Sequence, residues 1–441
     1  MSYGITDSQW YGDIGDKIRE KTGLSDHWTP SALASAIDAI SGGGASDENL
    51  KMIVEGTGGS FIDSTLSFIR PYGLAGIPDM VEVNCANVER IGSYAFNFCN
   101  ELTKATFPAC TSVEYNIFYT CSLVSQMFFP ALESINTSAF SGLSGLVSIP
   151  STFFPALKTL GQSAFAECKN LESVEMPVCE TVCGFIGCSK LSYVSFPEAK
   201  VIGYAAFAKC SSLTSVSFPL VEIIASDAFS RCYNLSSVFI PACKEIGSNA
   251  FSSCSALTAI SLPACEYIGY RAFASCSSLV QVYTPNVQSL SWSVFAYCSA
   301  LQSAIFPECS MIGAYAFQGC EQMSEISFPK AEEIGMAAFI GCLALESASF
   351  PAVKTVDGYA LANGYSLKTV FFGSLLTYIS SAALDGCSAL ESVYLLASAV
   401  QYFILPSGFS GTLYVPASLL SAYQNDYSYG SYSSQIVAYA E

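Results

Sequence analysis

The sequence predicts a solenoid of stacked coils, because one residue type returns at a constant period of 22 residues. The phenylalanines of this period are Phe96, Phe118, Phe140, Phe185, Phe207, Phe229, Phe251, Phe273, Phe295, Phe317 and Phe339. Phe165 interrupts the period, with gaps of 25 and 20 residues on its two sides. Counting back to Leu74 and on to Leu361 and Leu384 gives about 15 coils. One coil cannot bury its own phenylalanine, so neighbouring coils are expected to stack and share one core.

A second observation is the pattern inside each period, which residues 251–273 show well. Four residues with the spacing L-x-x-L-x-L-x-x-C are Leu257, Ile260, Leu262 and Cys265. This is the signature of a leucine-rich repeat, with cysteine where asparagine is the common alternative. Ile260 and Leu262 alternate with Ala259 and Ser261, which predicts a short strand with one face inward and one outward. Pro263 then ends the strand, because proline has no backbone N–H to donate.

The composition is the third observation. Hydrophobic residues make up 51% of the 441 residues and charged residues 12%, and the mean hydropathy is +0.42. No apolar run reaches the roughly 18 residues that a membrane helix needs, so we assign the apolar residues to the shared core and expect no membrane insertion. The net charge of −18 argues against nucleic acid and anionic membranes as partners, since both are bound mainly by lysine and arginine.

The repeated motif resembles a known family. It runs from Ile246-Gly247 through Ala250-Phe251 and Cys254 to Leu257, and copies of it recur in register along residues 74–396. In this respect the chain resembles the BspA-like, or Treponema-type, leucine-rich repeat family of bacteria. The resemblance implies a right-handed solenoid with a parallel sheet on its concave face, and a role in adhesion.

Both ends of the array are expected to be capped. Residues 397–441 contain Gly411–Ala417, then Ala422-Tyr423 and Ile436, and are similar to the segment that commonly closes such arrays. We therefore predict a C-terminal cap made of a strand and a helix. At the other end, residues 50–73 predict a capping hairpin that turns at Gly58-Gly59, preceded by a Gly/Ser linker over residues 42–49.

The 19 cysteines mostly fall into two columns of the repeat. Twelve lie three residues after the repeat phenylalanine or leucine, and five lie two residues after the repeat proline. Other coils have alanine or valine in the second column, which indicates a small buried slot where cysteine acts as a hydrophobe. We therefore predict reduced thiols. Cys179, Cys183 and Cys188 could be metal thiolates, but structural zinc prefers four paired ligands, so no metal is predicted.

Residues for catalysis are sparse. His27 is the only histidine, and no nucleophile, base and orienting group can be combined from the motifs present. Glu332-Glu333, or Glu172 with Glu175, could be the acids of a glycosidase. The favoured interpretation is that they are solvent-facing repeat positions. The sequence therefore predicts a protein that is not an enzyme and that has no cofactor.

The outward positions of the predicted strands are the first candidate binding surface. They lie two and four residues after the repeat leucine, and most are serine, threonine or alanine. The apolar exceptions that we single out as ligand-binding candidates are Tyr193, Phe239, Tyr283 and Ile305. Exposed aromatic residues favour contact with a protein or a glycan, although aromatic and β-branched residues are also simply good strand formers.

A second aromatic column is the alternative surface. It lies on the turn side of the coil, three residues before the repeat phenylalanine, with Tyr94 and Tyr315 one position later. Its members are Tyr115, Tyr204, Tyr270 and Trp292. Ring packing between coils would also explain this column.

Residues 1–41 do not follow the repeat and predict a helical hairpin. Trp10, Ile14 and Ile18 share one helical face, and Thr29-Pro30 is suited to begin a second helix. The stretch from Gly4 through Gly23 to Ile37 resembles the N-terminal segment of tail-associated proteins from phages and prophages of Gram-positive bacteria. The resemblance implies that the hairpin attaches to a virion or tail, with those three residues as the attachment face.

These observations predict a non-enzymatic receptor-binding protein of a phage or prophage tail, whose solenoid binds a cell-surface protein or glycan. The first residues have neither the basic nor the apolar region of a secretory signal, so we expect a virion component made in the bacterial cytoplasm. The alternative is a BspA-like adhesin, at the cell surface or secreted, that mediates contact with a host or matrix.

Overall fold

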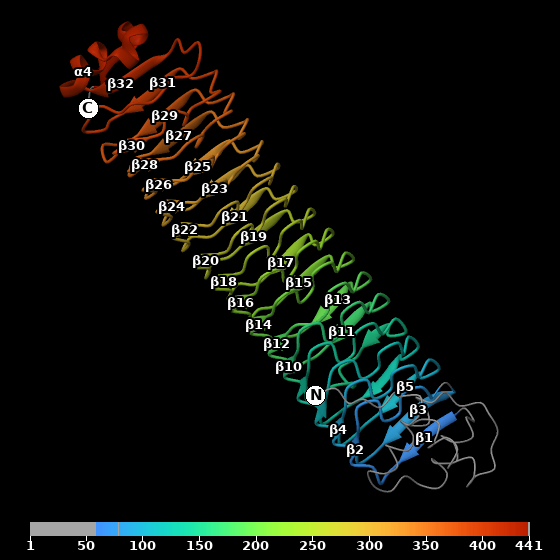
Figure 1. Cartoon of the computed structure of the whole chain (residues 1–441). Coiled ribbons are helices and arrows are strands. Elements are labelled where there is room, and N and C mark those ends of the chain that lie inside the picture. Colours follow the sequence, from blue (N-terminus) through green and yellow to red (C-terminus); the bar gives the residue numbers. More distant parts are fainter. Residues whose placement is uncertain (1–58, 78, 440–441) are drawn as a thin grey trace, which may run out of the picture. The chain divides into compact units, whose positions relative to one another are not determined.

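The computed structural model describes residues 59–77 and 79–439, and these divide into two compact units. The first contains the described residues up to 199 together with 209–211, and the second contains 200–208 and the residues from 212 onward. The described chain is a parallel β-solenoid of about 17 turns of about 22 residues (Figure 1). The predicted fold class is confirmed, with more turns than the 15 expected.

Each regular coil contributes two strands, of which the first is the longer one in every coil except that of β9, where both have two residues. The longer strands of the first unit are β1 (Gly59–Asp63), β3 (Met80–Cys85), β5 (Lys104–Thr106), β7 (Gln126–Phe128), β9 (Ser148–Ile149), β11 (Ser173–Glu175) and β13 (Tyr193–Ser195). Its shorter strands are β2 (Phe68–Ile69), β4 (Arg90–Ile91), β6 (Ser112–Val113), β8 (Ser134–Ile135), β10 (Thr159–Leu160) and β12 (Thr181–Val182).

The second unit repeats this arrangement. Its longer strands are β15 (Ser215–Ser217), β17 (Ser237–Phe239), β19 (Ala259–Ser261), β21 (Gln281–Tyr283), β23 (Ser303–Ile305), β25 (Glu325–Ser327), β27 (Ser347–Phe350), β29 (Thr369–Phe372) and β31 (Ser392–Leu395). Its shorter strands are β14 (Val201–Ile202), β16 (Ile223–Ile224), β18 (Glu245–Ile246), β20 (Tyr267–Ile268), β22 (Ser289–Leu290), β24 (Met311–Ile312), β26 (Glu333–Ile334), β28 (Thr355–Val356) and β30 (Tyr378–Ile379).

Strands of successive coils pair in parallel, with a register that follows the repeat. Ser261 of β19 lies beside Tyr283 of β21, and Tyr283 lies beside Ile305 of β23. Ala259 and Ser261 are exposed while Ile260 between them is buried, as the alternation in the sequence predicts. An outward position in one coil is therefore the direct neighbour of the same position in the next coil.

The core is a column of stacked phenylalanine rings. In the second unit, Phe229, Phe251 and Phe273 have ring centroids 5.1 and 5.3 Å apart, with interplanar angles of 6° and 2°. Phe165, in the first unit, keeps the column despite its irregular spacing, since its ring stacks on Phe140 at 5.1 Å and on Phe185 at 5.6 Å. The coil before Phe165 is three residues longer than the period and the coil after it is two residues shorter. Both differences lie outside the phenylalanine column.

Tight turns on both sides of each repeat phenylalanine need a left-handed backbone. Around Phe251, Asn249 and Ser253 have φ values of 55° and 63°. Gly319 and Gly341 take the same place as Ser253 in later coils, with φ values of 68° and 74°. Glycine adopts this conformation without the penalty that a Cβ atom causes.

A second inward column follows each longer strand, and one of its members is polar. Leu262, Thr284 and Phe306 occupy equivalent positions, each before a proline, and all three are fully buried. The Thr284 hydroxyl has no hydrogen-bond partner in the described part of the chain. Thr284 is thus a polar side chain in a position that apolar residues fill in the adjacent coils.

The first described coil extends the array towards the N-terminus. Gly59–Asp63 pairs in parallel with β3, and Phe68–Ile69 pairs in parallel with β4. These residues lie in the range 50–73 that we expected to form a capping hairpin, whose first arm lies outside the described residues. From Gly59 onward the chain already follows the solenoid path, because Phe61 and Ile69 enter the core as the repeat residues do.

The C-terminal segment combines strands with short helices. Its elements are β32 (Thr412–Pro416), η1 (Ala417–Leu419), α4 (Leu420–Asn425), η2 (Tyr427–Gln435) and β33 (Ile436–Tyr439). β32 pairs in parallel with β31, and β33 pairs in parallel with β32. Gln401 donates its backbone N–H to the Tyr423 hydroxyl at 2.9 Å and accepts a hydrogen bond from the Tyr429 hydroxyl at 2.6 Å. These two buried tyrosines attach the irregular residues before β32 to the cap.

Within the described residues, no helix has both the length and the apolar content to span a bilayer.

Candidate binding surface

The outward residues of the longer strands β15, β17, β19, β21 and β23 form a surface without charged side chains, which we call the strand face. Its ten positions are Ser215, Ser217, Ser237, Phe239, Ala259, Ser261, Gln281, Tyr283, Ser303 and Ile305. Three of the four predicted ligand-binding residues lie here, with 55% of Phe239, 56% of Tyr283 and 46% of Ile305 exposed. In Figure 1 these strands follow one another along one side of the second unit.

A shallow hollow of about 620 Å³ lies on this face. Tyr283 and Ile305 line it side by side, and Ser261, Gln281 and Ser303 supply polar groups between and around them. Phe239 does not line the hollow, although it belongs to the same face. The structure therefore brings Tyr283 and Ile305 together and places Phe239 outside their hollow.

Tyr193, the fourth predicted residue, lies on β13 of the first unit. It is 53% exposed and lies beside Ser173 of β11. Tyr193 is therefore exposed as predicted, but it is not one of the ten residues that define the strand face.

The second aromatic column is also exposed. In the second unit, Tyr204, Tyr270 and Trp292 each expose a large part of the side chain, and the guanidinium of Arg271 lies 5.9 Å from the centroid of the Tyr270 ring. The backbone N–H of Arg271 donates to the Trp292 carbonyl at 3.1 Å, so this column follows the turn between coils. These rings are exposed and available for contact with a partner.

Tyr115, in the first unit, belongs to a tyrosine cluster that sequence reasoning did not assemble. Tyr94 stacks on Tyr72, with ring centroids 5.1 Å apart, and meets Tyr115 and Tyr119 edge-on at 5.3 and 5.8 Å. The 22-residue spacing of Tyr72 and Tyr94 could have predicted that these two rings stack in neighbouring coils. Tyr119 belongs to a different column and comes close only because the turn folds back.

The cysteine columns have a structural role that accounts for their regularity. No disulfide joins the cysteines, all of which lie in the described part of the chain. Cys254 and Cys276 each donate a hydrogen bond from Sγ to the carbonyl of the preceding coil's phenylalanine, at 3.2 Å. Cys265 and Cys309, in the other column, donate to carbonyls two residues further on. The thiol is thus a small apolar group that still supplies one donor to a buried carbonyl.

Burial makes these thiols poor nucleophiles. Desolvation raises the pKa of Cys276 to about 12, and it raises the pKa of Cys309 and Cys342 to about 12 as well. A thiolate is needed both for nucleophilic attack and for metal binding, so a thiol with such a pKa does neither readily at neutral pH. In the described ranges, no group of three or more His, Cys, Asp or Glu side chains is placed to hold a metal ion, and this includes Cys179, Cys183 and Cys188.

The carboxylates that could have acted as glycosidase acids lie at the surface. Glu332 forms an ion pair with Lys354, whose Nζ lies 2.7 Å from its Oε2. Glu333 is exposed on β26, and Glu175 is exposed on β11. Lys–Glu pairs recur between adjacent coils, as with Lys244 and Glu222 at 2.7 Å, so these acids belong to the solvated sides of the coils.

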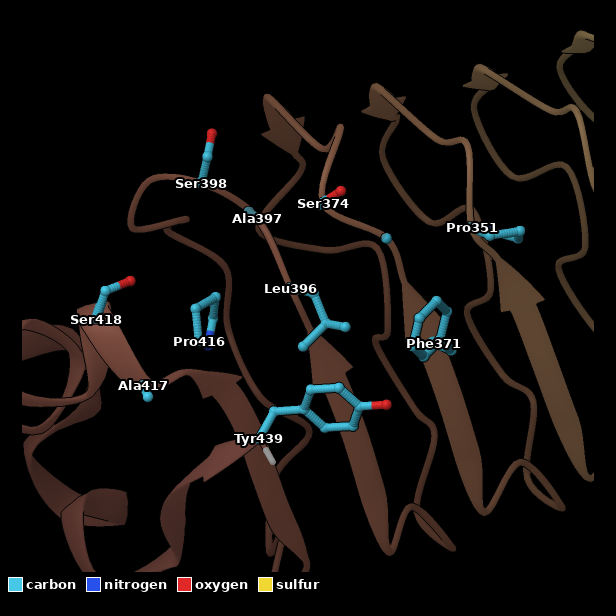
Figure 2. A pocket seen from close by; sticks show the side chains of 11 residues that line it. Pro351, Phe371, Ser374, Leu396, Ala397, Ser398, Pro416, Ala417, Ser418 and Tyr439 are labelled. Carbon is cyan, nitrogen blue, oxygen red and sulfur yellow. The ribbon is translucent and has the colours of Figure 1, made fainter. Parts of the chain in front are cut away.

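A larger hollow lies near the C-terminus, and sequence reasoning did not find it. Its volume is about 720 Å³, and it lies at the carboxyl ends of β29, β31, β32 and β33 (Figure 2). Its lining residues are Pro351, Phe371, Gly373, Ser374, Leu396, Ala397, Ser398, Pro416, Ala417, Ser418 and Tyr439. We call it the C-terminal hollow. It depends on the irregular path of residues 397–411, for which the repeat gives no signal.

The predicted attachment residues Trp10, Ile14 and Ile18, like His27, lie outside the described residues.

Comparison with known proteins identifies the repeat. A family model described as "BspA type Leucine rich repeat region (6 copies)" matches residues 69–183, 181–302 and 288–407. The chain belongs to the BspA-type leucine-rich repeat family. The chain is similar to a leucine-rich repeat protein from Bacteroides ovatus whose crystal structure is known. The two sequences are 22% identical, the TM-score is 0.55, and the match covers 77% of this chain and 88% of that chain.

A leucine rich cell surface protein from Faecalibacterium prausnitzii matches with 20% identity and a TM-score of 0.35, over 78% of this chain and 84% of that chain. No curated protein matches the BspA-type chain. The Bacteroides ovatus structure supports the solenoid fold, and the family assignment is consistent with a role in binding or adhesion.

Proposed function

We propose that this BspA-type chain is a non-enzymatic recognition protein whose strand face binds a cell-surface protein or glycan. The observation that carries the proposal is the exposure of Phe239, Tyr283 and Ile305 on the strand face, whose ten outward residues include no charged side chain. Rigid exposed rings contribute much of the binding energy at interfaces, because they bury a large area with little loss of side-chain freedom. The small residues between them allow a partner to come close to the sheet.

The lack of charge limits the kind of partner. A highly charged ligand would lose hydration on this surface without gaining an ion pair. A neutral glycan, or a protein patch rich in apolar and hydroxyl groups, would lose less. Hydrogen bonds to Gln281 and Ser303, at the edge of the hollow, would then orient such a ligand.

We further propose that the solenoid is presented as the receptor-binding part of a phage or prophage tail. This finer proposal rests on the resemblance of residues 4–37 to tail-associated proteins. The alternative, a bacterial adhesin at the cell surface or secreted, rests on the usual role of the BspA-like family. Genes for tail or lysis proteins beside the source gene would support the first proposal, and an upstream extension that encodes a leader would refute it.

Cell attachment tests both proposals. Purified, fluorescently labelled chain is incubated with Gram-positive cells and, separately, with cultured epithelial cells. The tail-type proposal expects attachment to the Gram-positive cells, and the adhesin alternative expects attachment to the epithelial cells. Treating the cells with protease or with periodate then distinguishes a protein receptor from a glycan receptor.

Two triple variants locate the surface. Phe239→Ser with Tyr283→Ser and Ile305→Ser removes the apolar groups of the strand face. We expect it to weaken attachment at least tenfold, since each lost anchor costs about 1 kcal/mol or more. The matched control replaces Tyr204, Tyr270 and Trp292 with serine, which removes the same number of exposed side chains from the turn side of the same unit. Full attachment by a folded strand-face variant would refute the strand face as the binding surface.

A further inference from the structure

The C-terminal hollow has a shape suited to a small ligand. Its volume of about 720 Å³ is in the range of small-molecule sites, and like the hollow on the strand face it is open to solvent. It opens where the chain leaves the repeat, since after Leu396 residues 397–411 follow an irregular path before β32 begins. On the opposite wall, Gly373 lies so close to Pro351 that a Cβ atom at this position would collide with the Pro351 carbonyl. The hollow therefore has one wall made of tightly packed turns and one made of the cap.

Two aromatic side chains line the hollow and are held by their neighbours. Phe371 on β29 and Tyr439 at the end of β33 are both half-buried. Tyr394 contacts each of them, with ring centroids 6.0 Å from Phe371 and 5.8 Å, edge-on, from Tyr439. Tyr394 is in turn stacked on Tyr414 at 4.4 Å. Because these contacts already order the two lining rings, a ligand would lose little free energy in fixing them.

The polar groups of the hollow are hydroxyls. Ser374, Ser398 and Ser418 are exposed and belong to three different segments, which follow β29, β31 and β32. Figure 2 shows Tyr439 extending towards Phe371, below Leu396 in the view, with Ser374 and Ser398 on the loops above them and Ser418 in the helical turn η1. The Ser398 hydroxyl points away from the two rings. None of the lining residues is an aspartate, glutamate, lysine, arginine or histidine. A charged ligand would find no opposite charge here, so the site favours a neutral one.

We propose that the C-terminal hollow binds a neutral saccharide. The C–H groups on one face of a pyranose ring are weakly positive and pack well on the negative face of an aromatic ring. Its hydroxyls, around the ring edge, match the serine hydroxyls and the backbone groups of the loops. A peptide that binds by adding a strand needs the free backbone edge of a sheet, whereas this hollow presents side chains at the ends of strands. A proline-rich peptide, which docks on aromatic grooves, is the competing ligand in the test below. The site is separate from the strand face and does not depend on the function proposed for it.

Saturation-transfer difference NMR on the full chain tests the proposal. The probes are neutral oligomers of glucose, galactose and N-acetylglucosamine, together with sialyllactose as an acidic probe and a proline-rich peptide. We expect transfer to the ring C–H protons of at least one neutral oligomer and none to the acidic probe. Tyr439→Ala should weaken binding of that oligomer roughly 3- to 10-fold, as expected for the loss of one aromatic contact. Tyr439→Phe, which keeps the ring, should stay within about threefold of the original affinity.

Two controls make the result specific. Tyr402→Ala removes a tyrosine that is 64% exposed and does not line the hollow, and it should leave saccharide binding unchanged. The strand-face triple variant should also leave it unchanged, which keeps the two sites distinguishable. The proposal is overturned if no neutral oligomer binds at about 10 mM, a concentration well above the dissociation constants of weak sites. It is also overturned if the peptide or sialyllactose binds instead, or if a folded variant with both Phe371→Ala and Tyr439→Ala still binds the oligomer fully.

Discussion

Replacing Thr284 with valine should stabilise the protein. Thr284 is fully buried, and its hydroxyl has no hydrogen-bond partner among the residues that the structure describes. The equivalent residues of the adjacent coils, Leu262 and Phe306, are apolar and equally buried. Valine has nearly the same shape as threonine, so the substitution replaces an unsatisfied hydroxyl with a methyl group and leaves the packing as it is.

The magnitude follows from the cost of burying that hydroxyl. A buried polar group without a partner destabilises a protein by about 1–3 kcal/mol, and we expect the valine variant to recover this amount. Because a solenoid is stabilised coil by coil, the gain should be largest in the coils next to Thr284. Native-state hydrogen exchange, detected by mass spectrometry, measures this gain in stability coil by coil. Amides of β21 and β23 should exchange about 5- to 150-fold more slowly, since 1.4 kcal/mol corresponds to a factor of ten.

Two controls separate the hydroxyl from other effects. Thr258→Val makes the same chemical change at an exposed position one coil away, and it should change stability by less than about 0.5 kcal/mol. Thr284→Ser keeps the hydroxyl and loses a methyl group, so it should destabilise by roughly 1 kcal/mol. Exchange that is unchanged or faster in Thr284→Val would mean that the hydroxyl is satisfied in solution, and the reasoning would be wrong.

Two further predictions concern the core. Phe251→Ala should destabilise by about 3–5 kcal/mol in urea denaturation, because Phe251 is fully buried and stacks on a ring on each side; a loss below about 1 kcal/mol would contradict the stacked-column account. Stability should also fall as the pH rises above about 9, because unfolded thiols then lose protons that buried thiols such as Cys276, with its pKa raised to about 12, retain. For each such thiol, the free energy of unfolding should fall by about 1.4 kcal/mol per pH unit between the pKa of the unfolded thiol and that of the folded thiol. The urea midpoint should therefore fall steeply in this pH range. A variant with Cys254→Ala, Cys276→Ala and Cys298→Ala should show a shallower fall, and equal slopes for the two proteins would refute the assignment.

The regular coils could be predicted from the sequence almost residue by residue. The 22-residue period placed Phe251 in the core, and the alternation of Ala259, Ile260 and Ser261 gave the correct inward and outward faces. Such predictions succeed because each coil meets the same neighbours, so one local pattern determines packing throughout. The coil that begins at Gly59 was missed because it has neither the repeat phenylalanine nor the cysteine that follows it.

The candidate sites were predicted less completely. Tyr283 and Ile305 were found because an outward strand position is visible in the alternation, and the register then made them neighbours. The C-terminal hollow was missed because Phe371 and Tyr439 are 68 residues apart and line the same hollow only as a result of the irregular path before β32. No period in the sequence encodes that path, since it depends on the buried tyrosines Tyr423 and Tyr429, which bind the backbone of Gln401 and Phe403.

The constant spacing of the phenylalanine column has an evolutionary consequence. Deleting residues 252–273 would join Phe251 to Ala274, so that Phe251 would stack on Phe295 in the place that Phe273 now occupies, at the start of a coil of the same pattern. Duplicating one coil would likewise add a ring to the column and two outward side chains to the sheet. Recombination between repeats can therefore lengthen, shorten or reorder the displayed residues while the phenylalanine column keeps its ring-on-ring stacking.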